Sequence, residues 1–188
     1  RCNLKCKHCG SDCTSSSVTP DMPWEDFRKV LVEVRSKYDP KDILVILSGG
    51  EPLIRNDIYD IAAEIRSLGF RWGLVSNGRF MNESNFDRLM AAGLGTATIS
   101  LDGLEEYHDA FRGVNGSFFS ASEAIRLFVP YQGKVGFDVV TCVTPSNFAK
   151  LPILKDYLIG LGLRQWRLFS VFPSGRAATD KSLMLSPE

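Results

Sequence analysis

Apolar residues recur along most of the chain in two patterns. Stripes with a period of three to four residues indicate amphipathic helices, and short continuous apolar runs indicate strands. The stripes predict helices over residues 24–38, 58–68, 84–92, 118–129 and 148–161. The runs predict strands over residues 42–48, 71–76, 96–101, 134–143 and 164–171. Because strands and helices alternate strictly, the sequence predicts an α/β fold with a parallel sheet, either open or closed into a barrel.

The first helix and the first strand carry the clearest burial patterns. Trp24, Phe27 and Tyr38 recur at helical spacing and are expected to pack in the core. Residues 43–47 form the continuous apolar run ILVIL, which is typical of a strand buried on both faces. Both patterns predict an interior position for this part of the chain.

Small and polar residues follow four of the predicted strands, in segments 48–52, 76–78, 100–103 and 173–176. The carboxyl ends of parallel strands meet at one edge of the sheet, where ligands bind in such folds. Loops after strands also favour Gly, Ser and Asn for purely structural reasons. Four such loops at one edge favour a ligand site there.

Composition narrows the classes of protein that fit. The chain has 188 residues, of which 44% are hydrophobic and 23% charged, so it is expected to fold as a globular domain rather than remain disordered. Lys plus Arg and Asp plus Glu both number 22, which argues against a nucleic-acid partner bound over the whole surface. No apolar run approaches the roughly 18 residues of a membrane span, so no membrane partner is expected.

The cysteines are unevenly placed. Four of the five lie within the first thirteen residues, and only Cys142 stands apart. An odd, clustered set makes a poor disulfide framework and favours metal ligation in a reducing compartment, which predicts a cytoplasmic protein. Cys142 lies in an apolar strand and is expected to be a small core residue.

The spacing Cys2-x3-Cys6-x2-Cys9 places three thiols within eight residues. Three thiolates can hold one compact iron–sulfur cluster and leave one iron open for a ligand. A structural zinc site is the alternative, with Cys13 or His8 as the fourth ligand. Under the cluster interpretation, Cys13 is a spare thiol.

These residues resemble the signature of the radical S-adenosylmethionine superfamily. The segment Cys2–Cys9 matches its C-x3-C-x2-C pattern, with His8 where an aromatic residue commonly stands. Segment 48–52, Ser-Gly-Gly-Glu-Pro, resembles the motif after the family's second strand. Segment 100–103 with the pair 112–113 resembles the fourth-strand region of the peptide- and protein-modifying branch, in which a SPASM extension often follows.

The resemblance implies a partial (β/α)6 TIM-like barrel with parallel strands. It implies a 4Fe–4S cluster held by Cys2, Cys6 and Cys9, whose open iron binds S-adenosylmethionine and whose electron cleaves it to a 5′-deoxyadenosyl radical. The expected substrate is a peptide or protein side chain, and the expected electron donor is of flavodoxin or ferredoxin type. Two alternatives stay open: a small-molecule substrate in cofactor biosynthesis, or a non-catalytic zinc- or iron–sulfur-binding module.

Three residues after the first predicted strand are expected to bind the cofactor. Gly49 and Gly50 would leave room for its methionine moiety, and Glu51 would accept hydrogen bonds from its ammonium group. Glu51 could instead cap the helix that follows.

Four further residues complete the expected cofactor site. Ser100 would bind a ribose hydroxyl, Arg112 a carboxylate, and His8 would lie beside the adenine, with Asn77 contacting cofactor or substrate. Arg112 could instead pair with Asp109 on a helix surface.

Three remaining features are interpreted from their surroundings. His108 follows a charged stretch and is expected at the solvated surface, whereas Arg176 is either an electrostatic contact near the ligand or exposed. Ser186-Pro187-Glu188 is typical of a helix start. Residues 1–188 are therefore expected to be a radical S-adenosylmethionine core domain trimmed of its first strand and last helix.

Overall fold

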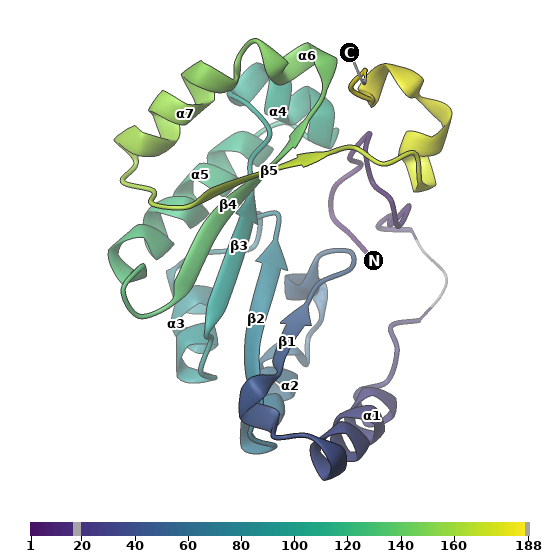
Figure 1. Cartoon of the computed structure of the whole chain (residues 1–188), viewed down its shortest axis with the longest axis vertical. Helices are drawn as coiled ribbons and strands as arrows, with labels where there is room; N and C mark the ends of the chain where they lie inside the picture. Colours follow the sequence, from purple (N-terminus) through teal and green to yellow (C-terminus); the bar gives the residue numbers. More distant parts are fainter. Residues whose placement is uncertain (17–19, 187–188) are drawn as a thin grey trace.

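The computed structural model describes residues 1–16 and 20–186. Five parallel strands form one sheet in the order β1-β2-β3-β4-β5 (Figure 1). The strands are β1 Leu44–Leu47, β2 Arg71–Ser76, β3 Thr96–Ser100, β4 Gly136–Val143 and β5 Trp166–Ser170. The predicted parallel α/β sheet is confirmed, and among the described residues it is an open partial barrel with β1 and β5 at its edges.

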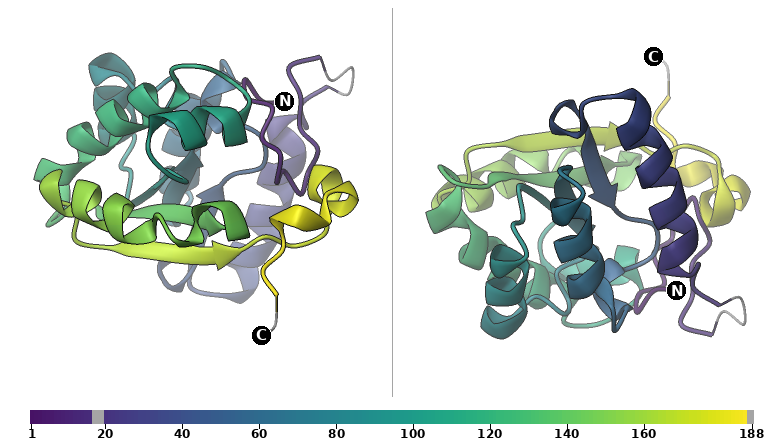
Figure 2. Two further views of the ribbon diagram at one scale, coloured as in Figure 1. Left: turned by 90° about the horizontal axis from the view of Figure 1, so that it is seen from above. Right: turned by 90° about the horizontal axis from the view of Figure 1, so that it is seen from below.

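Helices alternate with these strands, as the sequence predicts. They are α1 Trp24–Lys37, α2 Ile58–Ser67, α3 Glu83–Ala91, α4 Glu105–Arg112, α5 Ser117–Phe128, α6 Pro145–Phe148 and α7 Leu151–Gly160. Short 3-10 turns span Pro40–Asp42, Pro52–Ile54, Val129–Tyr131, Gly175–Thr179 and Lys181–Leu183. Figures 1 and 2 show α2, α3, α5 and α7 along one face of the curved sheet, and their apolar residues form its core.

The two faces of the sheet differ in chemistry. Successive side chains of a strand point to opposite faces. On β3 and β4, Ala97, Ile99 and Val139 face the helices and are fully buried. On the other face, the Thr98 hydroxyl donates to the Asp138 carboxylate (2.6 Å). The face away from the helices is therefore the one that can present polar groups to a ligand.

One helix prediction needs correction, and one helix was not predicted. Residues 148–161 were expected as one helix, but the structure ends α6 at Phe148 and begins α7 at Leu151. Pro152 explains the break, because proline fits the first turn of a helix and not its interior. The helix α4 escapes prediction because its eight residues carry too short an apolar stripe.

The burial predicted for the first helix and strand is partly wrong. Phe27 and Tyr38 are 51% and 65% exposed, although Trp24 does pack against the core. In β1, Leu44 and Ile46 are also exposed, because β1 lies at the edge of the sheet rather than within it. Trp72 is buried in the core, and the partly buried Trp166 packs against it.

The two ends of the described chain meet at the carboxyl edge of the sheet. Figure 2 shows the first residues beside the last turns, and the backbone N–H of Arg176 donates to the Cys9 carbonyl (3.0 Å). Pro187 and Glu188, part of the predicted helix start, lie outside the described residues. Among the described residues, no helix combines the length and apolar character needed to cross a membrane.

Candidate functional site

The carboxyl ends of β1, β2 and β3 surround a cavity of about 200 Å³. Nine of the ten residues predicted for the cofactor and metal site line it: Cys2, Cys6, Cys9, His8, Gly49, Gly50, Asn77, Ser100 and Arg112. Cys13 lines it as well. The fold thus brings together residues that are up to 110 positions apart in the sequence, since the numbers run from 2 to 112.

The cysteine loop, residues 2–13, has no regular helix or strand. It is held by backbone hydrogen bonds to the end of α4: Lys5 N–H donates to the Arg112 carbonyl (3.0 Å) and Lys7 N–H to the Phe111 carbonyl (2.9 Å). Those carbonyls belong to the last turn of a helix, where they lack partners within the helix. The loop therefore supplies hydrogen-bond donors to the carbonyls at the end of α4, and the same bonds hold the loop in place.

Glu51 is the predicted site residue that does not line this cavity. It is 3% exposed, and its carboxylate accepts hydrogen bonds from the Ser76 hydroxyl (2.9 Å) and from the N–H groups of Asn77 (2.8 Å) and Leu53 (3.2 Å). Burial raises its pKa despite these donors. The capping alternative is thus observed, and Glu51 also ties the β1 loop to the end of β2.

The two glycines before Glu51 have different surroundings. A side chain at Gly49 would meet open space, whereas a Cβ at Gly50 would lie 1.8 Å from the Arg1 carbonyl oxygen. Glu51 N–H donates to that same carbonyl (3.0 Å). Gly49 therefore borders free volume, and Gly50 is glycine because the backbone at the start of the chain passes against it.

Asn77 joins the end of β2 to the cysteine loop. Its Nδ2 donates to the Asn3 side-chain oxygen (2.8 Å) and lies 3.9 Å from the Cys2 sulfur. Ser100 is 9% exposed at the end of β3 and lines the same cavity. Both residues therefore occupy positions from which they can reach a ligand beside the cysteines.

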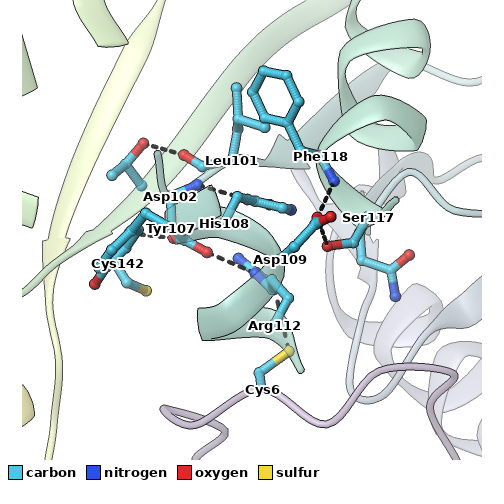
Figure 3. Close-up of polar contacts among 12 residues, drawn as sticks. Cys6, Leu101, Asp102, Tyr107, His108, Asp109, Arg112, Ser117, Phe118 and Cys142 are labelled. Atoms are coloured by element: carbon cyan, nitrogen blue, oxygen red, sulfur yellow. Dashed lines mark hydrogen bonds and ion pairs between the residues drawn. The ribbon is translucent and has the colours of Figure 1, made fainter. Parts of the chain in front are cut away.

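Arg112 pairs with Asp102 and not with Asp109 (Figure 3). Its Nε donates to the Asp102 carboxylate (2.6 Å), and its Nη1 lies within hydrogen-bonding range of the Cys6 sulfur (3.8 Å). The Asp102 side chain is fully buried and also accepts from the Cys142 N–H (2.8 Å). Burial alone would raise the pKa of Asp102, but the Arg112 charge and hydrogen bond, together with His8 and His108, outweigh it and the pKa is lowered.

His8 lies flat against Phe111, with ring centroids 4.4 Å apart and planes 8° apart. Its Nδ1 is buried without a hydrogen-bond partner among the described residues. Burial lowers the pKa of His8 to about 4, so the ring is neutral at neutral pH. A neutral, stacked ring with an unpaired nitrogen fits a site that a planar, hydrogen-bonding ligand completes.

The sequence analysis did not predict the positions of two residues near Arg112, His108 and Asp109 (Figure 3). His108, expected at the surface, is 1% exposed, and its Nδ1 accepts from the Asp102 N–H (3.1 Å). Asp109 accepts from Ser117 Oγ (2.7 Å) and from the Phe118 N–H (2.7 Å), which caps the start of α5. A carboxylate eight or nine residues before its partners lies outside the usual capping pattern, so the sequence carried no signal for it.

Cys142, expected in the core, is half-buried beside Asp102. Burial raises the pKa of its thiol to about 12, so it stays protonated at neutral pH. The thiol is therefore an unreactive packing group, in keeping with the sequence interpretation.

The donors at the cavity are mostly thiols. Within residues 1–16 and 20–186, no three His, Cys, Asp or Glu side chains converge on one metal position. A structural zinc ion is held by four ligand atoms at about 2.0–2.3 Å. A cubane cluster binds each cysteine through a different iron, so its ligands can be farther apart around a cavity of this kind.

Comparison with known proteins agrees with this geometry. The model of the radical SAM superfamily matches residues 1–154. The chain is 32% identical to the AdoMet-dependent heme synthase of Oleidesulfovibrio alaskensis, over 100% of the chain and 47% of that protein. It is 33% identical to the pre-heme d1 synthase of Dinoroseobacter shibae, over 96% of the chain and 44% of that protein.

The fold has close neighbours among solved structures. Streptococcus suis SuiB bound to S-adenosylmethionine superposes with a TM-score of 0.76 at 17% identity, covering 100% of this chain and 41% of SuiB. The chain thus spans about half the length of the curated relatives it matches. The chain belongs to the radical SAM superfamily, whose members use a 4Fe–4S cluster and S-adenosylmethionine.

Proposed function

We propose that the protein is a radical S-adenosylmethionine enzyme that acts on a small-molecule precursor in cofactor biosynthesis, with residues 1–188 as its core domain. One observation carries the proposal: three thiols and six predicted cofactor contacts line a single cavity. Cys2, Cys6 and Cys9 would hold the 4Fe–4S cluster. When bound, the cluster would supply the electron that cleaves S-adenosylmethionine to methionine and a 5′-deoxyadenosyl radical, which would remove hydrogen from the substrate.

The residues of this chain would orient the cofactor. Gly49 would admit its methionine moiety, Ser100 would bind a ribose hydroxyl, and His8 would stack beside the adenine. Arg112 would present a fixed positive charge to its carboxylate, because Asp102 holds the guanidinium in place. Asn77 would contact either ligand. Glu51 keeps its proposed role toward the ammonium group, although its carboxylate already accepts three hydrogen bonds.

The relatives favour a small molecule over a peptide. The sequence motifs alone predicted a peptide or protein substrate, but the curated relatives at 32% and 33% identity are a heme synthase and a pre-heme d1 synthase. SuiB, whose structure is also known with a precursor peptide, resembles the chain at only 17% identity, which supports the fold and not the substrate. A tetrapyrrole is therefore the first substrate class to test.

Several predicted properties stay predictions. They are the cytoplasmic location, the external donor of flavodoxin or ferredoxin type, and a C-terminal SPASM extension.

The test is production of 5′-deoxyadenosine. The protein is reconstituted anaerobically with iron and sulfide, reduced, and given S-adenosylmethionine with and without iron-coproporphyrin as probe. We expect 5′-deoxyadenosine and methionine in equal amounts, with more product when the tetrapyrrole is present. No 5′-deoxyadenosine from a protein with a full cluster would contradict the enzyme proposal. Product that a tetrapyrrole leaves unchanged would contradict the substrate class.

A further inference from the structure

Arg176 lies in the 3-10 turn Gly175–Thr179 that follows β5, and it contacts the cysteine loop at the other end of the sequence. Its side chain is 24% exposed, so most of this long cation lies against protein. The contacts reach four residues of the loop: Nε donates to the Cys6 carbonyl (2.8 Å), Nη1 to the Cys13 carbonyl (3.0 Å) and the Asp12 carboxylate (2.8 Å), and the backbone N–H to the Cys9 carbonyl (3.0 Å).

We propose that Arg176 is a positioning residue that holds the cysteine loop in the shape needed to assemble and keep the 4Fe–4S cluster. The inference rests on the proposed function, in which Cys2, Cys6 and Cys9 are the ligands. Arg176 touches no ligand sulfur in the described structure. It binds the peptide carbonyls of two ligand residues, and the direction of a peptide plane limits where the adjoining side chain can point.

The chemistry of arginine suits this task. The cysteine loop has no helix or strand of its own, so its peptide groups need other partners. A guanidinium presents several N–H donors in a fixed plane and can bind carbonyls from separate parts of a loop at once. The Arg176 guanidinium therefore ties residues 6, 12 and 13 to the turn after β5, and the Arg176 backbone N–H adds residue 9.

The backbone next to Arg176 supports the same conclusion independently. Gly175 has a φ of +57°, and a Cβ there would lie 2.3 Å from the Cys9 carbonyl oxygen and 2.6 Å from the Gly10 carbonyl oxygen. Only glycine permits both this φ and this approach. The turn after β5 therefore lies in direct contact with the peptide groups around the third ligand.

Asp12 adds a third observation. Its φ is +47°, the left-handed region that non-glycine residues seldom adopt. Its carboxylate pairs with Arg176, so the ion pair stabilises an uncommon backbone conformation between Cys9 and Cys13. The loop shape is thus maintained from outside the loop.

The test compares cluster retention in Arg176→Gln, Arg176→Lys and the control Arg164→Gln. Arg164 is exposed beside the other end of β5, and its side chain makes no hydrogen bond or ion pair within residues 1–16 and 20–186. Each protein is reconstituted anaerobically with iron and sulfide, and the rate of iron loss to a chelator is measured. We expect about tenfold faster loss for Arg176→Gln, the factor that one lost charge-assisted bond typically produces.

Arg176→Lys should lose iron at an intermediate rate, because one ammonium can keep one or two of the contacts. Arg164→Gln should match the unaltered protein. The melting temperature of the iron-free protein should hardly change in Arg176→Gln, which separates positioning of the loop from support of the whole fold. Equal iron loss in Arg176→Gln and the unaltered protein would overturn the proposal, as would a melting temperature that falls enough to explain the loss.

A further variant separates this inference from the proposed function. Cys2→Ala/Cys6→Ala/Cys9→Ala should bind no cluster. If that variant assembles the cluster, the ligand assignment fails and with it the proposed function. If it does not, and Arg176→Gln still behaves like the unaltered protein, only the positioning role is wrong.

Discussion

Arg112 and Arg176 both hold the cysteine loop, but they reach different atoms of it. Arg112 is 7% exposed, pairs with the fully buried Asp102, and directs its Nη1 to the Cys6 sulfur. Arg176 is more exposed, pairs with the exposed Asp12, and donates to peptide carbonyls. One arginine acts at the atom that would bind iron, and the other acts on the backbone that carries it.

The two arginines differ in burial, and this difference gives them different roles. A buried charge is costly unless it is paired, so Arg112 and Asp102 depend on each other. A positive charge close to a ligand sulfur also raises the reduction potential of any cluster bound there. A partly exposed ion pair contributes little to folding, so the effect of Arg176 is expected to be local.

The largest expected effect comes from removing a ligand that both arginines contact. Cys6→Ala should abolish stable cluster binding, because its sulfur is one of only three proposed cluster ligands. Cys13→Ala should retain it, although Cys13 lines the same cavity. Iron and sulfide per chain after anaerobic reconstitution give the answer. Equal iron in the two variants would show that the three-cysteine assignment is wrong.

The next effect concerns folding. Asp102→Ala leaves the buried Arg112 charge unpaired and should lower the free energy of unfolding by about 3–5 kcal/mol. Arg176→Gln should cost about 1 kcal/mol or less, since its ion pair with Asp12 is partly exposed. Urea unfolding of the iron-free proteins measures both. Similar losses of unfolding free energy in the two variants would show that the two arginines do not differ in their contribution to folding.

A smaller effect should appear in the reduction potential. Arg112→Gln removes a positive charge near the Cys6 sulfur and leaves Asp102 uncompensated, so both changes disfavour the added electron. We expect the midpoint potential to fall by roughly 50 mV, since about 59 mV corresponds to 1.4 kcal/mol for one electron. Arg176→Gln should shift it far less. The measurement is a redox titration followed by electron paramagnetic resonance, without S-adenosylmethionine, and a rise in potential for Arg112→Gln would contradict the interpretation.

The smallest effect lies behind Arg112, at the start of α5. Burial alone would raise the pKa of Asp109, but the Phe118 N–H, the Ser117 hydroxyl and the Gly116 N–H lower it below its usual 3.8. A depressed pKa in the folded state stabilises the protein above pH 4, and this contribution is lost as the pH falls through the folded pKa. Asp109→Asn should cost about 1 kcal/mol at pH 7 and less near pH 3. Unfolding at both pH values tests this, and a cost independent of pH would exclude the charged cap.

Much of the fold could be predicted because the spacing of apolar residues along the chain differs between helices and strands. All five strands lie where the apolar runs place them, within a few residues at each end. The cysteine spacing likewise predicts a set of cluster ligands without any structure, because the three residues are neighbours in the chain. The predicted cofactor contacts were found together because the carboxyl ends of parallel strands share one edge.

The site predictions that failed depend on contacts between distant residues. The sequence allowed Arg112 to pair with Asp109, three positions away. In the structure it pairs with Asp102, whose carboxylate has no access to water and therefore needs a charged partner. His108 follows charged residues in sequence, yet α4 turns it toward the Asp102 backbone. Glu51 lies in the expected motif, and its role toward the cofactor stays a prediction; what the sequence did not show is that three donors from Leu53, Ser76 and Asn77 already bind its carboxylate.

The sequence by itself determined the order of strands and helices, the three-cysteine spacing and the small residues after four of the five strands, because each is encoded within a few neighbouring positions. Only the tertiary structure decided which arginine reaches a sulfur, which reaches a carbonyl, and which carboxylate is buried deeply enough to need a partner. Those outcomes depend on distance and burial. Residues 6 and 176 become neighbours only when the sheet forms, because the loop that begins the described chain and the turn after β5 then meet at its carboxyl edge.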